Sequence, residues 1–129
     1  MISASPIVVI DDDSDHLDML VTVLERAGFG AAGFTDSRKG LYYLFDNPAA
    51  LAVVDMFMPD MDGLELVRRL QVSRPELPLI GVSGLGNAAS HLWSMCNAGA
   101  TTSLRKPVGP KRFLATVEDV LRRAAKRAA

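Results

Sequence analysis

The sequence predicts an α/β domain in which a parallel sheet is covered by helices on both faces. Short apolar runs rich in β-branched residues alternate with longer segments of helical periodicity along the whole chain. Strands that are separated by helices pair in parallel, because the chain must cross the sheet between them. The length of 129 residues and the apolar fraction of 49% suit one globular domain. We expect a single domain over residues 1–129, with its core between about residue 5 and residue 125.

Five short segments are predicted as strands. Those over residues 6–10, 51–54 and 79–82 are apolar runs, which is typical of strands that are buried on both faces of a parallel sheet. The segments over residues 30–34 and 102–104 are weaker or shorter candidates. The prediction of a sheet therefore rests mainly on the three apolar runs.

Five longer segments are predicted as helices. In the first, apolar residues recur with helical spacing from Leu17 to Leu24, and Gly28 follows where a helix would end. The last begins near Pro110, whose missing N–H costs nothing in the first turn of a helix. The predicted helices cover residues 14–27, 37–45, 64 to about 75, 87–98 and 110 to about 125.

Cysteine content and hydropathy indicate a protein of a reducing compartment. Cys96 is the only cysteine, which excludes an internal disulfide framework. The longest apolar runs, such as residues 49–54, are too short to cross a bilayer, and the N-terminus lacks the pattern of an export signal. We expect a cytoplasmic protein with no membrane partner.

Charge is distributed unevenly along the chain. The net charge is −1, but residues 1–65 carry 12 acidic and 3 basic side chains, whereas residues 66–129 carry 3 acidic and 11 basic ones. The near-neutral total gives no reason to expect direct nucleic-acid binding. The basic segment over residues 122–127 is interpreted as a solvated helix end that suits the helix dipole. The acidic clustering gives the first indication of function.

Polar and charged residues follow several predicted strands at the point where each strand ends. In sheets of this class the ligand site lies beyond the carboxyl ends of the strands. Because the residues come from four different strands, we expect their side chains to meet in one crevice. The candidate site residues are Asp11, Asp12, Asp55, Ser83 and Lys106.

This set of side chains suggests phosphoryl transfer onto an aspartate. Converging carboxylates repel one another, and a divalent cation removes that penalty. Ligands that are all oxygen suit Mg²⁺, which takes one or two carboxylates from a protein and keeps several waters. Lys106 and the Ser83 hydroxyl would bind the oxygens of a phosphoryl group. Asp55 is the preferred nucleophile because it stands alone, whereas Asp11 and Asp12 are paired as metal ligands would be.

Four marks occur in a specific order and spacing along the chain. They are the strand-terminal acidic pair at residues 11 and 12, the stretch over residues 55–63, Ser83, and Lys106 followed by Pro107. Each mark is weak alone, but the four together are very specific. On these residues the whole chain resembles the receiver domain of two-component response regulators, in particular the chemotaxis-regulator type.

The resemblance implies a fold and a set of residue roles. The implied fold is a flavodoxin-like, doubly wound sheet of five parallel strands in the order 2-1-3-4-5, with five helices on its two faces. Asp55 would be the phosphoacceptor, and Ser83 and Lys106 would contact the phosphoryl oxygens. The implied protein ligands of an Mg²⁺ ion are Asp12, Asp55, the backbone carbonyl of Phe57 and, partly through water, Asp11.

The resemblance also implies partners and a mode of action. The domain would be a phosphorylation-activated signalling switch that assists only its own phosphorylation and dephosphorylation, and not an enzyme. A sensor histidine kinase or a phosphotransfer protein would donate the phosphoryl group. A downstream protein or a fused output domain would bind the face made by the fourth helix, the fifth strand and the fifth helix. Whether the domain forms a homodimer stays open.

Three residues depart from the pattern of this family. Ser103 stands where an aromatic residue usually transmits the signal, so we expect phosphorylation to be preserved and the relay to be altered. Phe57 and Leu85 stand where polar residues often position the water that attacks the acyl phosphate. Two apolar side chains there would shield the phosphoryl group, so we expect slow self-dephosphorylation.

Two alternative functions are weighed against the switch. A phosphatase of the haloacid dehalogenase type also uses an aspartate nucleophile, Mg²⁺ and a lysine. That class requires a second aspartate two residues after the nucleophile, where this chain has Phe57, and usually a cap domain. The other alternative is a receiver-like interaction module that no longer switches by phosphorylation, as Ser103 would allow.

Several residues outside this set are given structural interpretations. Asp13 is expected at a helix N-terminus, where the dipole favours a negative charge. His16 and His91 are interpreted as surface residues on helices, and Cys96 as a small core residue. For Trp93, packing in the core is favoured slightly over a partner surface.

Overall fold

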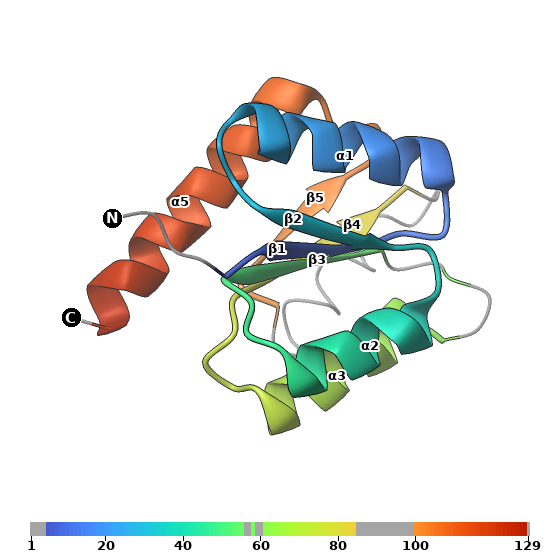
Figure 1. Cartoon of the computed structure of the whole chain (residues 1–129), viewed down its shortest axis with the longest axis vertical. Helices are drawn as coiled ribbons and strands as arrows, with labels where there is room; N and C mark the ends of the chain where they lie inside the picture. Colours follow the sequence, from blue (N-terminus) through green and yellow to red (C-terminus); the bar gives the residue numbers. More distant parts are fainter. Residues whose placement is uncertain (1–4, 56–57, 59–60, 85–99, 129) are drawn as a thin grey trace.

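A computed structural model of the chain describes residues 5–55, 58, 61–84 and 100–128. These residues form a five-stranded parallel sheet in the order β2-β1-β3-β4-β5 (Figure 1). The strands are β1 (Ile7–Ile10), β2 (Ala31–Phe34), β3 (Leu51–Asp55), β4 (Leu79–Ser83) and β5 (Thr102–Arg105). The helices in the described ranges are α1 (Ser14–Arg26), α2 (Ser37–Asp46), α3 (Gly63–Ser73) and α5 (Pro110–Ala128). The predicted fold class and strand order are confirmed.

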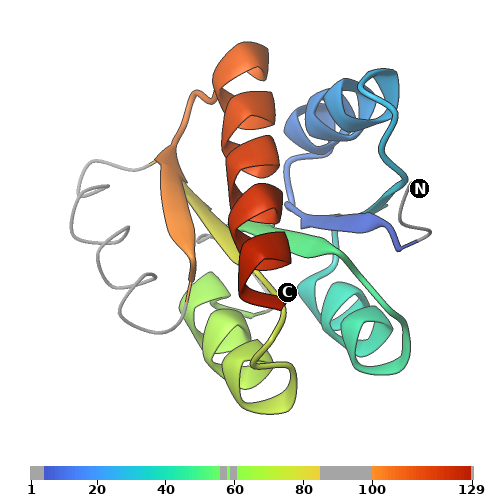
Figure 2. The same cartoon turned by 90° about the vertical axis from the view of Figure 1, so that its left-hand side faces the viewer.

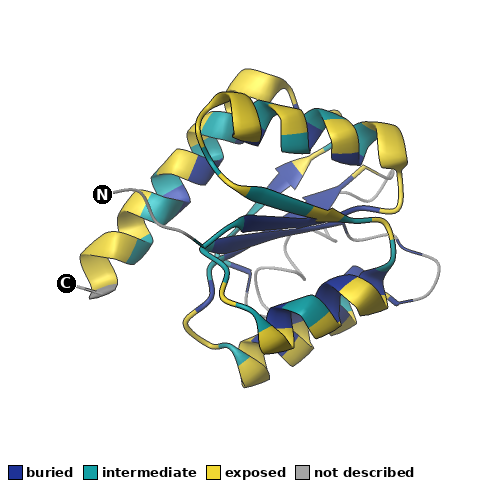
Figure 3. Ribbon diagram, viewed as in Figure 1, coloured by how far each residue is buried: buried dark blue, intermediate teal, exposed yellow. Residues whose placement is uncertain are grey.

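Among the described elements, the sheet lies between two pairs of helices. Figures 1 and 2 show α1 and α5 on one face, and α2 and α3 on the other. Alternate residues of β1 enter the two cores: Val8 packs in the cluster with α2 and α3, and Val9 packs in the cluster with α1 and α5. Both faces of the central strands β1 and β3 are therefore buried (Figure 3), which explains why β1 is apolar at every position and why β3 is apolar up to Asp55.

The register of the sheet brings the predicted site residues to one edge. β1 pairs with β3 up to the residues that precede Asp11 and Asp55, so these two aspartates follow side by side. Ser83 directly follows the β4 residue that pairs with Asp55, and Lys106 directly follows the β5 residue that pairs with Ser83. The backbone N–H of Lys106 also donates to the Ser83 carbonyl at 2.8 Å.

Aspartates precede and cap three of the described helices. The Asp13 carboxylate accepts hydrogen bonds from the backbone N–H groups of Asp15 and His16 at 3.1 and 3.2 Å, which caps α1. Asp36 caps α2 and Asp62 caps α3 in the same manner. The helix-terminal role expected for Asp13 is confirmed.

The boundaries differ from the prediction by a few residues. β3 and β4 each extend one residue beyond the predicted strand and include Asp55 and Ser83, and α5 continues to Ala128. The predicted helix over residues 87–98 lies outside the described residues, so the expectation of five helices stays a prediction. The Lys106–Pro107 peptide bond, whose isomer the sequence leaves open, is cis. Within the described ranges, no helix combines the length and apolar character needed to cross a membrane.

Candidate functional site

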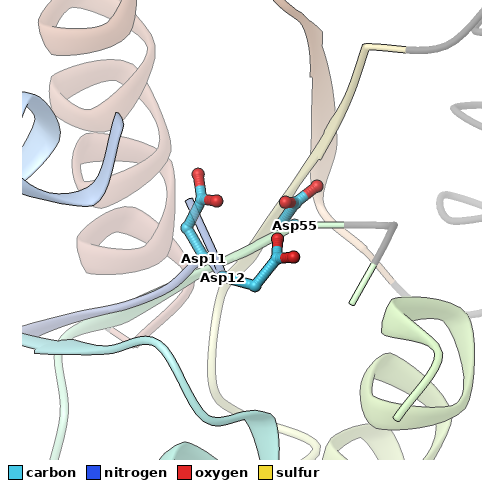
Figure 4. A group of neighbouring side chains, drawn as sticks. All are labelled: Asp11, Asp12 and Asp55. Carbon is cyan, nitrogen blue, oxygen red and sulfur yellow. The ribbon is translucent and has the colours of Figure 1, made fainter. Parts of the chain in front are cut away.

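Three carboxylates meet at the carboxyl edge of the central strands. One oxygen from each of Asp11, Asp12 and Asp55 lies within 4.8 Å of the others, as predicted (Figure 4). Asp11 is 2% exposed and Asp55 is 4% exposed, whereas Asp12 is exposed to solvent. Repulsion among three negative charges at this spacing favours the binding of a cation.

Lys106 supplies a positive charge to the same edge. Its Nζ lies 3.2 Å from Asp55 Oδ2 and 3.5 Å from Asp11 Oδ2. Partial burial alone would lower the pKa of Lys106, but the carboxylates of Asp55 and Asp11 outweigh it and hold the pKa above its usual value. The ammonium is therefore charged at neutral pH. One positive charge leaves the group of three carboxylates with a net negative charge.

Ser83 places a hydroxyl beside this cluster. Its Oγ is buried and has no hydrogen-bond partner among the residues that the structure describes. A buried hydroxyl without a partner typically costs about 1–3 kcal/mol, and that cost is removed when an acceptor binds. The Ser83 side chain is therefore suited to an anionic ligand that enters from the open end of the sheet.

An open pocket of about 460 Å³ gives a ligand access to this edge. Its lining residues are Asp12, Asp13, His16, Asp55, Gly84, Lys106 and Pro107. The pocket combines carboxylate oxygens with an ammonium group, which is the donor set that Mg²⁺ and a phosphoryl group require. The residues present therefore fit both the cation and the phosphoryl group predicted from the sequence.

Comparison with known proteins identifies the family. The family model for the response regulator receiver domain matches residues 7–118. The chain belongs to this family. Receiver domains are the phosphorylation-activated switches of two-component signalling systems, so the predicted class of function is confirmed. Nothing in these matches favours a haloacid-dehalogenase-type phosphatase.

Similar proteins extend this assignment. The chain is 33% identical over 124 residues to the transcriptional regulatory protein FixJ from Bradyrhizobium diazoefficiens, covering 96% of this chain and 60% of FixJ. The crystal structure of a CheY-like receiver domain protein from Methanospirillum hungatei matches with a TM-score of 0.91 and 30% identity, over 97% of this chain and 99% of that one. The receiver domain of NtrX from Brucella abortus matches with a TM-score of 0.85 and 28% identity, over 90% and 98% of the two chains. The chain spans less than two thirds of FixJ.

His16 is a residue of the acidic site that sequence reasoning missed. His16 was expected on the surface, but its side chain is only 13% exposed, and its Nδ1 contacts Asp11 Oδ2. His16 lies in the first turn of α1, which follows the end of β1 after a short connection. The sequence carries no separate signal for this contact, because helical periodicity does not define how the first turn of α1 is set against the end of β1.

Gly84 is a second residue that the sequence did not single out. A Cβ atom at this position would lie 2.8 Å from the Cβ of Lys106, closer than side chains approach one another. The glycine therefore leaves room for the Lys106 side chain to reach the carboxylates. The remaining predicted residues Phe57, Leu85, His91, Trp93 and Cys96 lie outside the described residues.

Proposed function

We propose that Asp55 is the phosphoacceptor of this receiver domain. The observation that carries the proposal is the position of its carboxylate, which is buried beside two other carboxylates and lies 3.2 Å from the Lys106 ammonium. An Asp55 oxygen would attack the phosphorus of a phosphohistidine. The new O–P bond forms as the P–N bond breaks, and the departing imidazole keeps the electron pair and takes up a proton.

The protein groups that would hold Mg²⁺ are Asp12 and Asp55 directly, Asp11 partly through water, and the backbone carbonyl of Phe57. The spacing of the three carboxylates supports the assignment of the side-chain ligands. When bound, Mg²⁺ neutralises the charge of the carboxylates and of the incoming phosphoryl oxygens, which otherwise repel each other.

Lys106 and Ser83 would bind the phosphoryl oxygens. The ammonium of Lys106 already lies against Asp55, so a small rotation of its flexible side chain would bring it to an oxygen of the new phosphoryl group. The buried Ser83 Oγ would gain the acceptor that it lacks among the described residues. Both groups thus bind the phosphorylated state better than the free one, which is the requirement for a switch.

The donor would be a sensor histidine kinase or a phosphotransfer protein in the cytoplasm, as in other two-component systems. The domain would assist its own phosphorylation and dephosphorylation without acting on another substrate. Its output would be altered binding of a downstream protein or a fused output domain at the face of the fourth helix, β5 and α5. Ser103 in β5 lacks the usual aromatic ring, so the relay would proceed through the backbone that follows Ser83 and through the helix predicted after it.

Intact mass after incubation with a small acyl-phosphate donor tests this proposal. With Mg²⁺, we expect the native protein to gain the mass of one phosphoryl group and the Asp55→Asn variant to gain none. Omission of Mg²⁺ should abolish the gain in the native protein. Equal labelling of both proteins would reject Asp55, and no labelling of either would favour an interaction module that does not switch.

A further inference from the structure

The contact between His16 and Asp11 has no role in the function proposed above. We propose that His16 is a positioning residue for the metal site, and that its Nδ1–H group holds the Asp11 carboxylate in the orientation that the cation requires. This inference rests on the proposed function, because it assumes that Asp11 serves a divalent cation. It assigns a new role to a residue that lines the same pocket as Asp12 and Asp55.

The Asp11 carboxylate is surrounded by donors on both of its oxygens. Oδ1 accepts a hydrogen bond from the backbone N–H of Asp13 at 3.0 Å. Oδ2 is shared by His16 Nδ1 and by Lys106 Nζ, which lies 3.5 Å away. At 2% exposure, Asp11 has almost no contact with bulk water, so these three protein donors fix its orientation.

His16 is itself held in place by the start of α1. Its backbone N–H donates to Asp13 Oδ1 at 3.2 Å, and its side chain is 13% exposed. A carboxylate only accepts hydrogen bonds, so its contact with His16 places a proton on Nδ1. The second ring nitrogen, Nε2, is buried and has no partner among the described residues. An apolar side chain would fill this space at lower cost, so the value of the histidine lies in its Nδ1 contact.

The shared oxygen of Asp11 gives His16 a second effect. Lys106 lies between Asp55 Oδ2 and Asp11 Oδ2, and in the proposed function it turns toward the phosphoryl group. That movement removes one of the two donors from Asp11 Oδ2. His16 would keep the buried oxygen partnered, whereas without His16 the movement of Lys106 would leave it without a protein donor, which is unfavourable.

Metal binding by three variants of His16 tests this role. The amide nitrogen of asparagine takes the place of Nδ1, whereas that of glutamine takes the place of Nε2, and leucine offers no donor. Binding of Mn²⁺ would be followed by the loss of its free-ion signal in electron paramagnetic resonance, with Mg²⁺ as competitor. We expect His16→Leu and His16→Gln to weaken binding of both ions by about tenfold, as the loss of an outer hydrogen bond does in other metal sites.

The asparagine variant provides the matched control. His16→Asn should bind Mn²⁺ and Mg²⁺ nearly as tightly as the native protein, a rescue that mere space filling would not produce. If His16→Leu binds as tightly as the native protein, or if His16→Asn binds as weakly as His16→Gln, the inference is overturned. The comparison of the two amide variants stands even if the leucine variant does not fold. Failure of the native protein to bind either ion would instead overturn the proposed metal site, and the inference with it.

Discussion

The ion pairs at the carboxyl edge of the sheet in this receiver domain have different physical consequences from those on α5. At the carboxyl edge of the sheet, Asp11 and Asp55 are almost fully buried and share the ammonium of Lys106. On α5, Asp119 contacts Arg123 and lies 3.9 Å from Arg122, and all three side chains are at least 40% exposed. Water and salt screen the pairs on α5, so they contribute little to stability. The buried carboxylates at the sheet edge lack this screening, so the energy of their negative charges depends on the protein groups around them.

The response to Mg²⁺ is expected to give the largest effect. At a concentration 100 times its Kd, an ion that binds only the folded protein raises the free energy of unfolding by about 2.7 kcal/mol. Asp12→Asn removes a neighbour that repels the other two carboxylates, so it should be more stable than the native protein without Mg²⁺ and less stable with it. Urea unfolding with and without Mg²⁺, against NaCl of equal ionic strength, measures this reversal of order. A native protein that responds equally to NaCl would contradict the metal site.

Removal of Lys106 is expected to have the next largest effect. Lys106→Met leaves Asp11 and Asp55 without their shared positive charge, and we expect a loss of about 2 kcal/mol in the free energy of unfolding. This loss is smaller than the loss expected when one partner of a fully buried ion pair is removed, because the Lys106 side chain is 24% exposed. The matched substitution Arg123→Met on α5 should leave the urea midpoint unchanged.

The raised pKa of Lys106 determines how the stability difference between the native protein and Lys106→Met depends on pH. Its carboxylate neighbours raise the folded-state pKa above the ordinary value of 10.5. The stabilisation is therefore fully present below pH 10.5 and is lost as the pH rises through the folded-state pKa. The stability gap between the native protein and Lys106→Met should stay constant at neutral pH and narrow only above that value. A gap that closes near pH 7 would show that another group carries the effect.

The smallest effect is expected on α5. The hydrogen bond from Arg123 outweighs the opposing effect of desolvation and holds the pKa of Asp119 below its ordinary value of 3.8. The stabilisation is present above pH 3.8 and is lost as the pH falls through the lowered pKa. We expect the unfolding midpoint of Asp119→Asn to differ only slightly from that of the native protein at neutral pH. The difference between the two unfolding midpoints should vanish in acid or at high salt. Thermal unfolding across a pH series and a salt series would measure this loss.

The sequence was sufficient to predict where the acidic site lies. Apolar runs buried on both faces identified the central strands, and the rule for parallel sheets placed Asp11, Asp55, Ser83 and Lys106 at one edge. The structure brings these residues together because β1, β3, β4 and β5 are parallel and in register. These predictions succeed because apolar runs, and the polar residues that follow them, are local features of the chain that the sequence shows directly.

Two features of the site could not be predicted in this way. The environment of His16 depends on how α1 is set against the end of β1, and helical periodicity alone does not define that position. The need for a glycine at position 84 depends on the path of Lys106, which lies 22 residues further along the chain. Both features depend on contacts between segments that are distant in sequence or belong to different elements. These contacts are set by tertiary packing, which a single sequence does not specify.

The burial of β1 and β3 on both faces has a consequence for motion in the domain. Backbone amides in such strands exchange with solvent only when the whole domain unfolds, so they are expected to be the slowest to take up deuterium. Asp55 is the last residue of β3, and Asp11 directly follows β1. Both aspartates are thus attached to strands whose backbone is expected to open last. Rearrangements on phosphorylation would therefore have to occur in the segments around the two aspartates and not in the backbone that carries them.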